Sequence, residues 1–76
     1  SDKQGYSTVM TLVNELSGYT YIHTDEFNGV RKMLFKNGSS VKVVLWMPCE
    51  QECTGKTKIA GVDVNISQTP KIVTLF

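Results

Sequence analysis

The sequence predicts one small, mainly β domain: an antiparallel β-sandwich or sheet of about five strands, preceded by one N-terminal helix. Three observations support this prediction. The chain has 76 residues, which is enough for a single core. After residue 18, short runs alternate apolar and polar residues, as half-buried strands do. The connections between these runs are tight, which favours antiparallel pairing. We therefore expect one domain over 1–76, with a helix over 1–18 and strands over 19–76.

The expected helix is indicated by apolar residues at spacings of three and four, which places them on one stripe. They are Tyr6, Val9, Met10, Val13 and Leu16. Ser1 or Asp2 would cap its start, and Gly18 stands where a left-handed C-cap residue belongs. Several β-branched residues lower its intrinsic helix propensity, so the helix should depend on packing against another surface.

The first two strands are expected over 19–24 and 29–36, and a third over 41–46. Asn37-Gly38 predicts a tight hairpin between the second and third strands. The third strand is nearly continuous in apolar residues, which predicts a central place in the sheet. Strand alternation around this turn predicts which side chains form the core. We expect Val43, Leu45 and Phe35 in the core, with Leu34 and Val44 on the opposite face.

The segment 48–57 is polar and is expected to be a loop. It carries the only two cysteines, Cys49 and Cys53, as two thiols or as one local disulfide. Residues 58–66 resume alternation and predict one strand, with Gly61 as a possible bulge. Pro70 introduces a short last strand over 71–76.

Catalytic chemistry is not expected from this chain. His23 is the only histidine, and it lies in an alternating strand rather than beside a nucleophile. Asp25-Glu26 is best interpreted as a solvated turn, because adjacent strand residues point to opposite faces. Gly-Lys-Thr at 55–57 lacks the glycine and the helix of a phosphate-binding loop. We therefore predict no enzyme activity, no catalytic residue and no cofactor. We also predict no metal site, because a structural zinc site usually requires four ligands.

Charge and hydropathy also exclude some partners. The formal net charge is +1, with basic residues dispersed, so neither nucleic acid nor an anionic membrane surface is an expected partner. No apolar stretch approaches the roughly 20 residues of a membrane span. Asn37-Gly38-Ser39 and Asn65-Ile66-Ser67 match the N-glycosylation pattern, which is short enough to occur by chance. The sequence does not determine the localisation. It favours a secreted or periplasmic compartment.

Three aromatic residues are candidates for contact with a ligand. Tyr19, Tyr21 and Trp46 lie in expected strands and could form a platform for a sugar ring. Aromatic residues in strands more often pack within the core or across strands, and we favour that role here. A small domain gains from burying these rings in every molecule, without a ligand.

Five segments together resemble a known family. They are 5–18 (GYSTVMTLVNELSG), 19–24 (YTYIHT), 29–38 (GVRKMLFKNG), 41–46 (VKVVLW) and 66–73 (ISQTPKIV). Their order is similar to the C-terminal end of a clan-A (β/α)8 glycoside hydrolase, where the last barrel helix leads into a small antiparallel β-sandwich. The resemblance implies a non-catalytic ancillary domain whose partner is the parent barrel, with carbohydrate as a possible ligand. It carries over no catalytic residue, because the family's catalytic carboxylates lie on barrel strands.

The alternative hypothesis is a free-standing α+β binding module with a protein or carbohydrate ligand. Such a module would lay its helix across its own sheet, as in the cystatin-like arrangement. A barrel helix would instead pack against the barrel. The position of the helix therefore distinguishes the two hypotheses.

Overall fold

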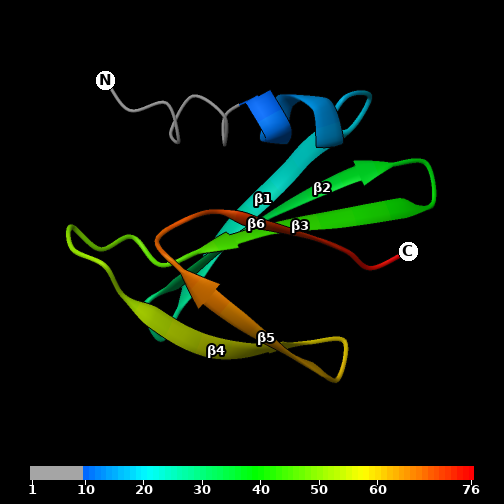
Figure 1. Ribbon diagram of the computed structural model, residues 1–76. Coiled ribbons are helices and arrows are strands. Elements are labelled where there is room, and N and C mark those ends of the chain that lie inside the picture. Colours follow the sequence, from blue (N-terminus) through cyan, green and yellow to red (C-terminus); the bar gives the residue numbers. More distant parts are fainter. Residues whose placement is uncertain (1–9) are drawn as a thin grey trace.

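The computed structural model describes residues 10–76, and over these residues the chain forms six strands in two antiparallel sheets (Figure 1). The strands are β1 (Thr20–Phe27), β2 (Val30–Asn37), β3 (Ser40–Trp46), β4 (Thr54–Ile59), β5 (Val62–Ser67) and β6 (Lys71–Thr74). One sheet has the order β1-β2-β3-β6, and β4 and β5 form a separate hairpin. The predicted small antiparallel β fold is confirmed, with one strand more than expected.

The β1–β2 turn is made by Asn28 and Gly29, between the paired residues Phe27 and Val30. Both turn residues have positive φ, 52° and 77°, as a two-residue type I′ turn requires. Asn-Gly is the favoured sequence for that turn because both residues tolerate the left-handed region. The sequence interpretation placed its hairpin signal only at the second Asn-Gly pair.

The β2–β3 turn lies one residue later than predicted. Asn37 pairs with Ser40 and belongs to the strand, so the two-residue loop is Gly38-Ser39. Within the loop only Gly38 has positive φ, at 59°, which fits a turn that needs glycine at its first position. The hairpin was predicted correctly, and its loop residues were not.

The faces predicted for Val43, Leu45 and Val44 of β3 are right, and those predicted for the two residues of β2 are wrong. A two-residue loop always pairs an even-numbered residue with an odd-numbered one. Leu34 therefore pairs with Val43 and shares its face, whereas Phe35 pairs with Lys42 on the other face. Leu34 packs against the core, and Phe35 lies on the face that carries Val44, in reverse of the prediction.

The segment predicted as a single strand over 58–66 is a hairpin. Ile59 pairs with Val62 across a turn of Ala60 and Gly61, whose φ values are 50° and 81°. Gly61, which was predicted as a possible bulge, is therefore a turn residue. Strand β4 begins at Thr54, inside the expected loop, and includes the Gly-Lys-Thr segment. A Cβ on Gly55 would lie 3.0 Å from Met47 Sδ, so the glycine allows β4 to pass close to that side chain.

Strand β1 is longer than predicted and contains a bulge. The pairing register with β2 shifts between Tyr21 and His23, so the intervening Ile22 is the additional residue. As a result Tyr21 and His23 lie on opposite faces, although simple alternation placed them on the same one. The strand also includes Asp25 and Glu26, which were predicted to lie in a turn.

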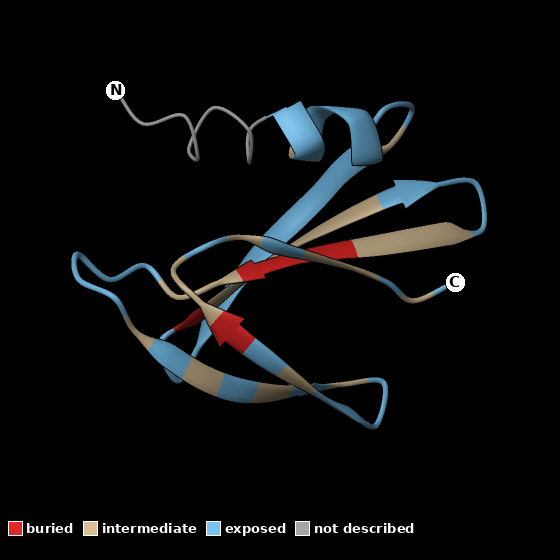
Figure 2. Ribbon diagram, in the orientation of Figure 1, coloured by how far each residue is buried: buried red, intermediate tan, exposed pale blue. Residues whose placement is uncertain are grey.

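The core lies between one face of the four-stranded sheet and the β4–β5 hairpin (Figure 2). We call this side of the sheet the core face. Its buried residues are Val30, Val43 and Leu45, and Ile66 of the hairpin completes the cluster. A backbone hydrogen bond of 2.8 Å from Met47 N to Ser67 O ties the end of β3 to β5. The apolar alternation of β3 thus positions the hairpin over the sheet.

The loop between β3 and β4 is closed by a disulfide. Cys49 and Cys53 are bonded, with their Cα atoms 6.7 Å apart. The Cys53 backbone N–H donates to Gln68 Oε1 at 3.1 Å, which links the loop to the segment before β6. Of the two possibilities that the sequence left open, the structure contains the disulfide.

Residues 10–15 are helical, and Gly18 follows them with φ 82°, as predicted for a left-handed C-cap. The expected caps Ser1 and Asp2 and the stripe residues Tyr6 and Val9 lie outside the described residues. The helix stands at the end of the sheet where β1 begins and β2 ends, and a Cβ on Gly18 would lie 3.5 Å from Asn37 Nδ2 (Figure 1). No helix within 10–76 has the length and hydropathy needed to cross a bilayer.

The first prediction concerns Leu45, which has no exposed surface. We expect Leu45→Ala to lower the free energy of unfolding by about 2–5 kcal/mol, because it removes apolar contacts and leaves a cavity. Denaturation in urea measures the change. Val62→Ala is the control, since Val62 is 63% exposed and should lose less than about 0.5 kcal/mol. Equal losses from both variants would show that β3 is not central.

The second prediction concerns Ala60, which occupies the left-handed region without being glycine or asparagine. A Cβ in that region costs roughly 1–2 kcal/mol, and asparagine tolerates it better. Ala60→Asn should therefore stabilise the chain by up to about 1 kcal/mol, measured by thermal unfolding. Ala60→Val should destabilise it, because a β-branched residue is worse at positive φ. A stabilising valine would contradict the turn geometry.

Candidate functional site

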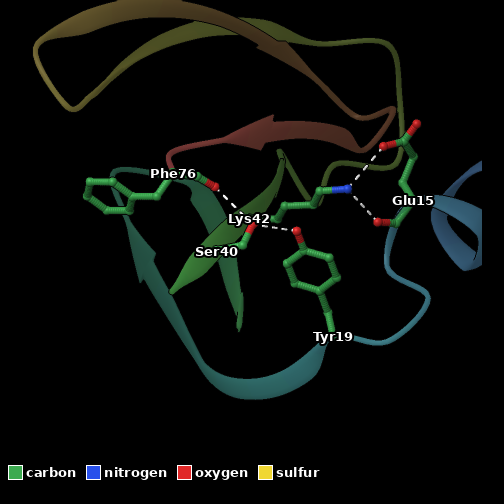
Figure 3. Close-up of polar contacts among 5 residues, drawn as sticks. All are labelled: Glu15, Tyr19, Ser40, Lys42 and Phe76. Atoms are coloured by element: carbon green, nitrogen blue, oxygen red, sulfur yellow. Dashed lines mark hydrogen bonds and ion pairs between the residues drawn. The ribbon is translucent and has the colours of Figure 1, made fainter. Parts of the chain in front are cut away.

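The end of the helix, the start of β3 and Phe76 meet in a polar cluster that we call the clasp (Figure 3). Its members are Glu15, Tyr19, Ser40, Lys42 and Phe76. These residues are far apart in the sequence, and they lie together because β3 runs beside the segment after β6. The clasp therefore connects the helix to the sheet at the helix C-terminus.

Lys42 is the central residue of the clasp, and its side chain is only 14% exposed. Its Nζ donates to the Glu15 backbone oxygen at 2.6 Å and to Glu15 Oε2 at 3.3 Å. The same ammonium lies 4.8 Å from the centroid of the Tyr19 ring. The last carbonyls of a helix have no partner within it and carry partial negative charge, so a cation is favourable there.

Tyr19 and Ser40 form a chain of hydrogen bonds through the clasp. Ser40 Oγ donates to the Phe76 backbone oxygen at 2.9 Å. Because a serine hydroxyl has one proton, the Tyr19 hydroxyl is the donor in the 2.6 Å bond to Ser40 Oγ. The predicted ligand contact Tyr19 thus has its hydroxyl and one ring face engaged within the chain.

Tyr21 and Trp46 lie on the face of the sheet opposite the core, which we call the aromatic face. The Tyr21 ring meets Phe35 edge to face, with centroids 5.7 Å apart, and its hydroxyl bonds to Thr24 Oγ1 at 2.7 Å. Trp46 lies at the other end of the face, where the Arg31 guanidinium is 5.9 Å from its ring centroid. Arg31 in turn donates twice to Glu26 Oε1, at 3.0 and 2.8 Å.

The three candidate aromatic residues therefore share a face without forming one platform. The row that holds Phe35 and the row that holds Arg31 are four residues apart along β2, or about 13 Å at the usual strand rise of roughly 3.3 Å per residue. Tyr19 and Trp46 each have a cation near the ring. Tyr21 is 50% exposed, and the packing role favoured from the sequence stays a prediction for these residues.

On the core face, a cleft of about 270 Å³ lies between the sheet and the tip of the β4–β5 hairpin. We call it the hairpin cleft. Its polar lining comes from β1, β2 and the hairpin: His23, Asp25, Lys32 and Lys58. Its apolar lining consists mainly of Leu34, Val43, Ile59 and Leu75. His23 Nε2 and Asp25 Oδ2 lie 3.0 Å apart at its edge.

A larger and more polar cavity, of about 650 Å³, lies between the β4–β5 hairpin and the start of β6. Thr54, Lys56, Asn65 and Thr69 are among the residues that line it. Lys71 lines it too, and its Nζ already donates to the Asn65 backbone oxygen at 2.9 Å. The cavity offers hydroxyl and amide groups, although most of its lining surface is apolar.

The clasp and the hairpin cleft were not anticipated from the sequence. For the clasp and for the cleft, the sequence contains one indication, a lysine within an apolar strand pattern. Lys42 interrupts the apolar third strand, and Lys32 stands two residues from Val30 and Leu34 on the core face. A lysine at an inward position indicates either a partner or an opening to solvent. Among residues 10–76, no group of three or more histidine, cysteine, aspartate or glutamate side chains could hold a metal ion.

Comparisons of this chain with protein-family models, with curated proteins and with solved structures found no significant match.

The third prediction concerns the clasp. Lys42→Met keeps the aliphatic stem but removes the ammonium, so Glu15 and Tyr19 lose their charged partner. We expect a loss of about 2–4 kcal/mol, the sum of one charge-assisted hydrogen bond and one cation–π contact. Amide hydrogen exchange should accelerate at 12–17 more than in β3. Lys36→Met, at an exposed lysine of β2, is the control. Unchanged helix exchange in Lys42→Met would refute the anchoring role.

Proposed function

We propose that this chain is a non-catalytic accessory β module that packs, through its N-terminal helix, against a glycoside hydrolase (β/α)8 domain. The resemblance of five segments to that family suggested the class. The single observation that supports it best is the position of the helix, whose described apolar residues are not buried on the chain's own sheet. That position was the criterion that separates an accessory module from a free-standing α+β module.

Two apolar side chains of the helix are exposed to solvent, which supports the proposal. Met10 is 40% exposed and Val13 is 58% exposed, although both belong to the apolar stripe. Leu12 and Leu16 are half-buried. The clasp holds the helix by its C-terminal carbonyl and by one lysine rather than by an apolar face. Met10 and Val13 of the stripe are thus left for another surface, as expected of a barrel helix.

The clasp also gives the proposed module a mechanical role. A helix that belongs to a neighbouring domain transmits that domain's orientation only if its end is fixed to the sheet. Lys42 supplies this fixation by its bond to the last helical residue, Glu15, and its ammonium also lies over the ring of Tyr19. In our proposal the clasp therefore orients the sandwich relative to the barrel, and the barrel covers Met10 and Val13.

The fourth prediction tests this proposal with Val13→Lys. In the 76-residue chain the substitution should change the free energy of unfolding by less than about 0.5 kcal/mol, as for exposed positions in general. In a longer polypeptide that includes the coding sequence upstream of Ser1, it should destabilise the protein by more than about 1 kcal/mol, because it places a charge in an apolar interface. Asn14→Lys adds the same charge at an exposed polar position and serves as the control.

Three results would count against the proposal. One is a large loss of stability from Val13→Lys in the 76-residue chain, which would mean that the helix packs on its own domain. Another is an upstream coding sequence without the alternating strand and helix pattern of a barrel. The third is turnover of aryl glycosides by the 76-residue chain that disappears in Asp25→Asn or Glu26→Gln.

A further inference from the structure

We propose that the hairpin cleft binds a small organic carboxylate, with Lys32 and Lys58 as the groups that hold the anion. The inference is independent of the proposed parent domain, because it uses only residues within the sheet and the hairpin. The cleft brings the β1–β2 hairpin together with the tip of the β4–β5 hairpin, which lies more than 20 residues later in the sequence.

Lys32 is the first group of the proposed site. It pairs with Leu45 and shares the core face with Val30 and Leu34, so its stem runs along apolar side chains. Its cross-strand neighbour on β1 is Asp25, but that carboxylate is bonded to His23 instead. Over residues 10–76 the Lys32 ammonium has no hydrogen-bond or ion-pair partner. Lys32 is half-buried, and an ammonium without a partner in the chain can accept an anion as its counter-ion.

Lys58 is the second group and comes from the opposite wall. It lies next to the turn at the tip of the hairpin, beside Ile59 and Ala60, which also line the cleft. Within the described chain its ammonium, too, has no partner. The lysines of the other polar clusters differ: Lys42 and Lys71 both donate to backbone oxygens of this chain.

The lining and size of the cleft define the rest of the ligand. Between the charged groups, the lining is apolar, with Leu34, Ile59 and Leu75. The cleft, at about 270 Å³, has the volume of roughly nine water molecules at about 30 Å³ each. A ligand of about nine non-hydrogen atoms would fit, with an apolar ring or chain on the apolar lining and a carboxylate near the lysines.

Asp25 sets the orientation of such a ligand. The lining holds two lysine ammonium groups and one carboxylate, that of Asp25. The carboxylate of Asp25 lies 3.0 Å from His23 Nε2, at the β1 side of the cleft. A bound anion should therefore approach Lys58 and Lys32 and avoid the β1 side. Removal of the Asp25 charge should strengthen the binding.

The experiment uses benzoate, a carboxylate of nine non-hydrogen atoms, and benzamide, its uncharged counterpart of the same size. The ¹⁵N-labelled 76-residue chain is titrated at pH 7, and amide shifts are followed by NMR. We expect saturable shifts at 32–34 and 58–60, and affinity for benzamide at least fivefold weaker. Lys32→Met and Lys58→Met should each weaken benzoate binding at least fivefold, and Asp25→Asn should strengthen it about twofold.

Lys56→Met is the matched control, because it makes the same change of charge on the same strand but lines the larger cavity. It should leave benzoate affinity within twofold of the unmodified chain. Lys58 is exposed, so its methionine variant should fold even if the Lys32 variant does not. Equal binding of benzamide, an equal effect of Lys56→Met, or no saturable shift at the cleft would overturn the proposal.

Discussion

The apolar contact between Ile66 of the hairpin and the core face of β3 is the constraint on which the rest of the structure depends. A chain of this length buries a modest fraction of its surface, and a two-stranded hairpin alone is at best marginally stable in water. The sheet and the hairpin bury each other's apolar residues: Leu45, Val43 and Val30 of the sheet pack against Ile66 of the hairpin. The bond from Met47 to Ser67 fixes their relative position. The hairpin cleft exists because the tip of the hairpin extends over β1 and β2 beyond this contact.

A second consequence of this arrangement is that the helix is not needed to cover the core. The hairpin occupies the core face, and the helix is held at the end of the sheet by polar groups of the clasp. Apolar residues of the helix stripe can therefore remain exposed without loss of the domain's own packing. In a protein where the helix covered the sheet, Val13 would be buried. We favour the attached module as a hypothesis because the hairpin, and not the helix, covers the core face of the sheet.

The parts of the fold that were predictable are those set by local pattern. The apolar run of β3 predicted a central strand, and Leu45 is fully buried there; the glycine after the helix predicted a left-handed cap. The bulge at Ile22 could not be predicted, because the sequence alternates through it and only pairing with β2 reveals the additional residue. The turn at Ala60 was missed because alanine seldom adopts positive φ. Lys32 and Lys58 lie far apart in the sequence, and only the position of the hairpin over the sheet brings them to one cleft.

Strand β1 is one of the two edge strands of the four-stranded sheet, and all eight of its residues are exposed. Such an edge presents unpaired backbone groups that could recruit a strand from another molecule. Here the bulge at Ile22 interrupts the regular spacing of those groups, and Asp25 and Glu26 place two negative charges beside it. Two copies aligned edge to edge would bring like charges close together and would find no continuous ladder. These features, which have no part in the core, oppose edge-to-edge pairing between copies of the chain.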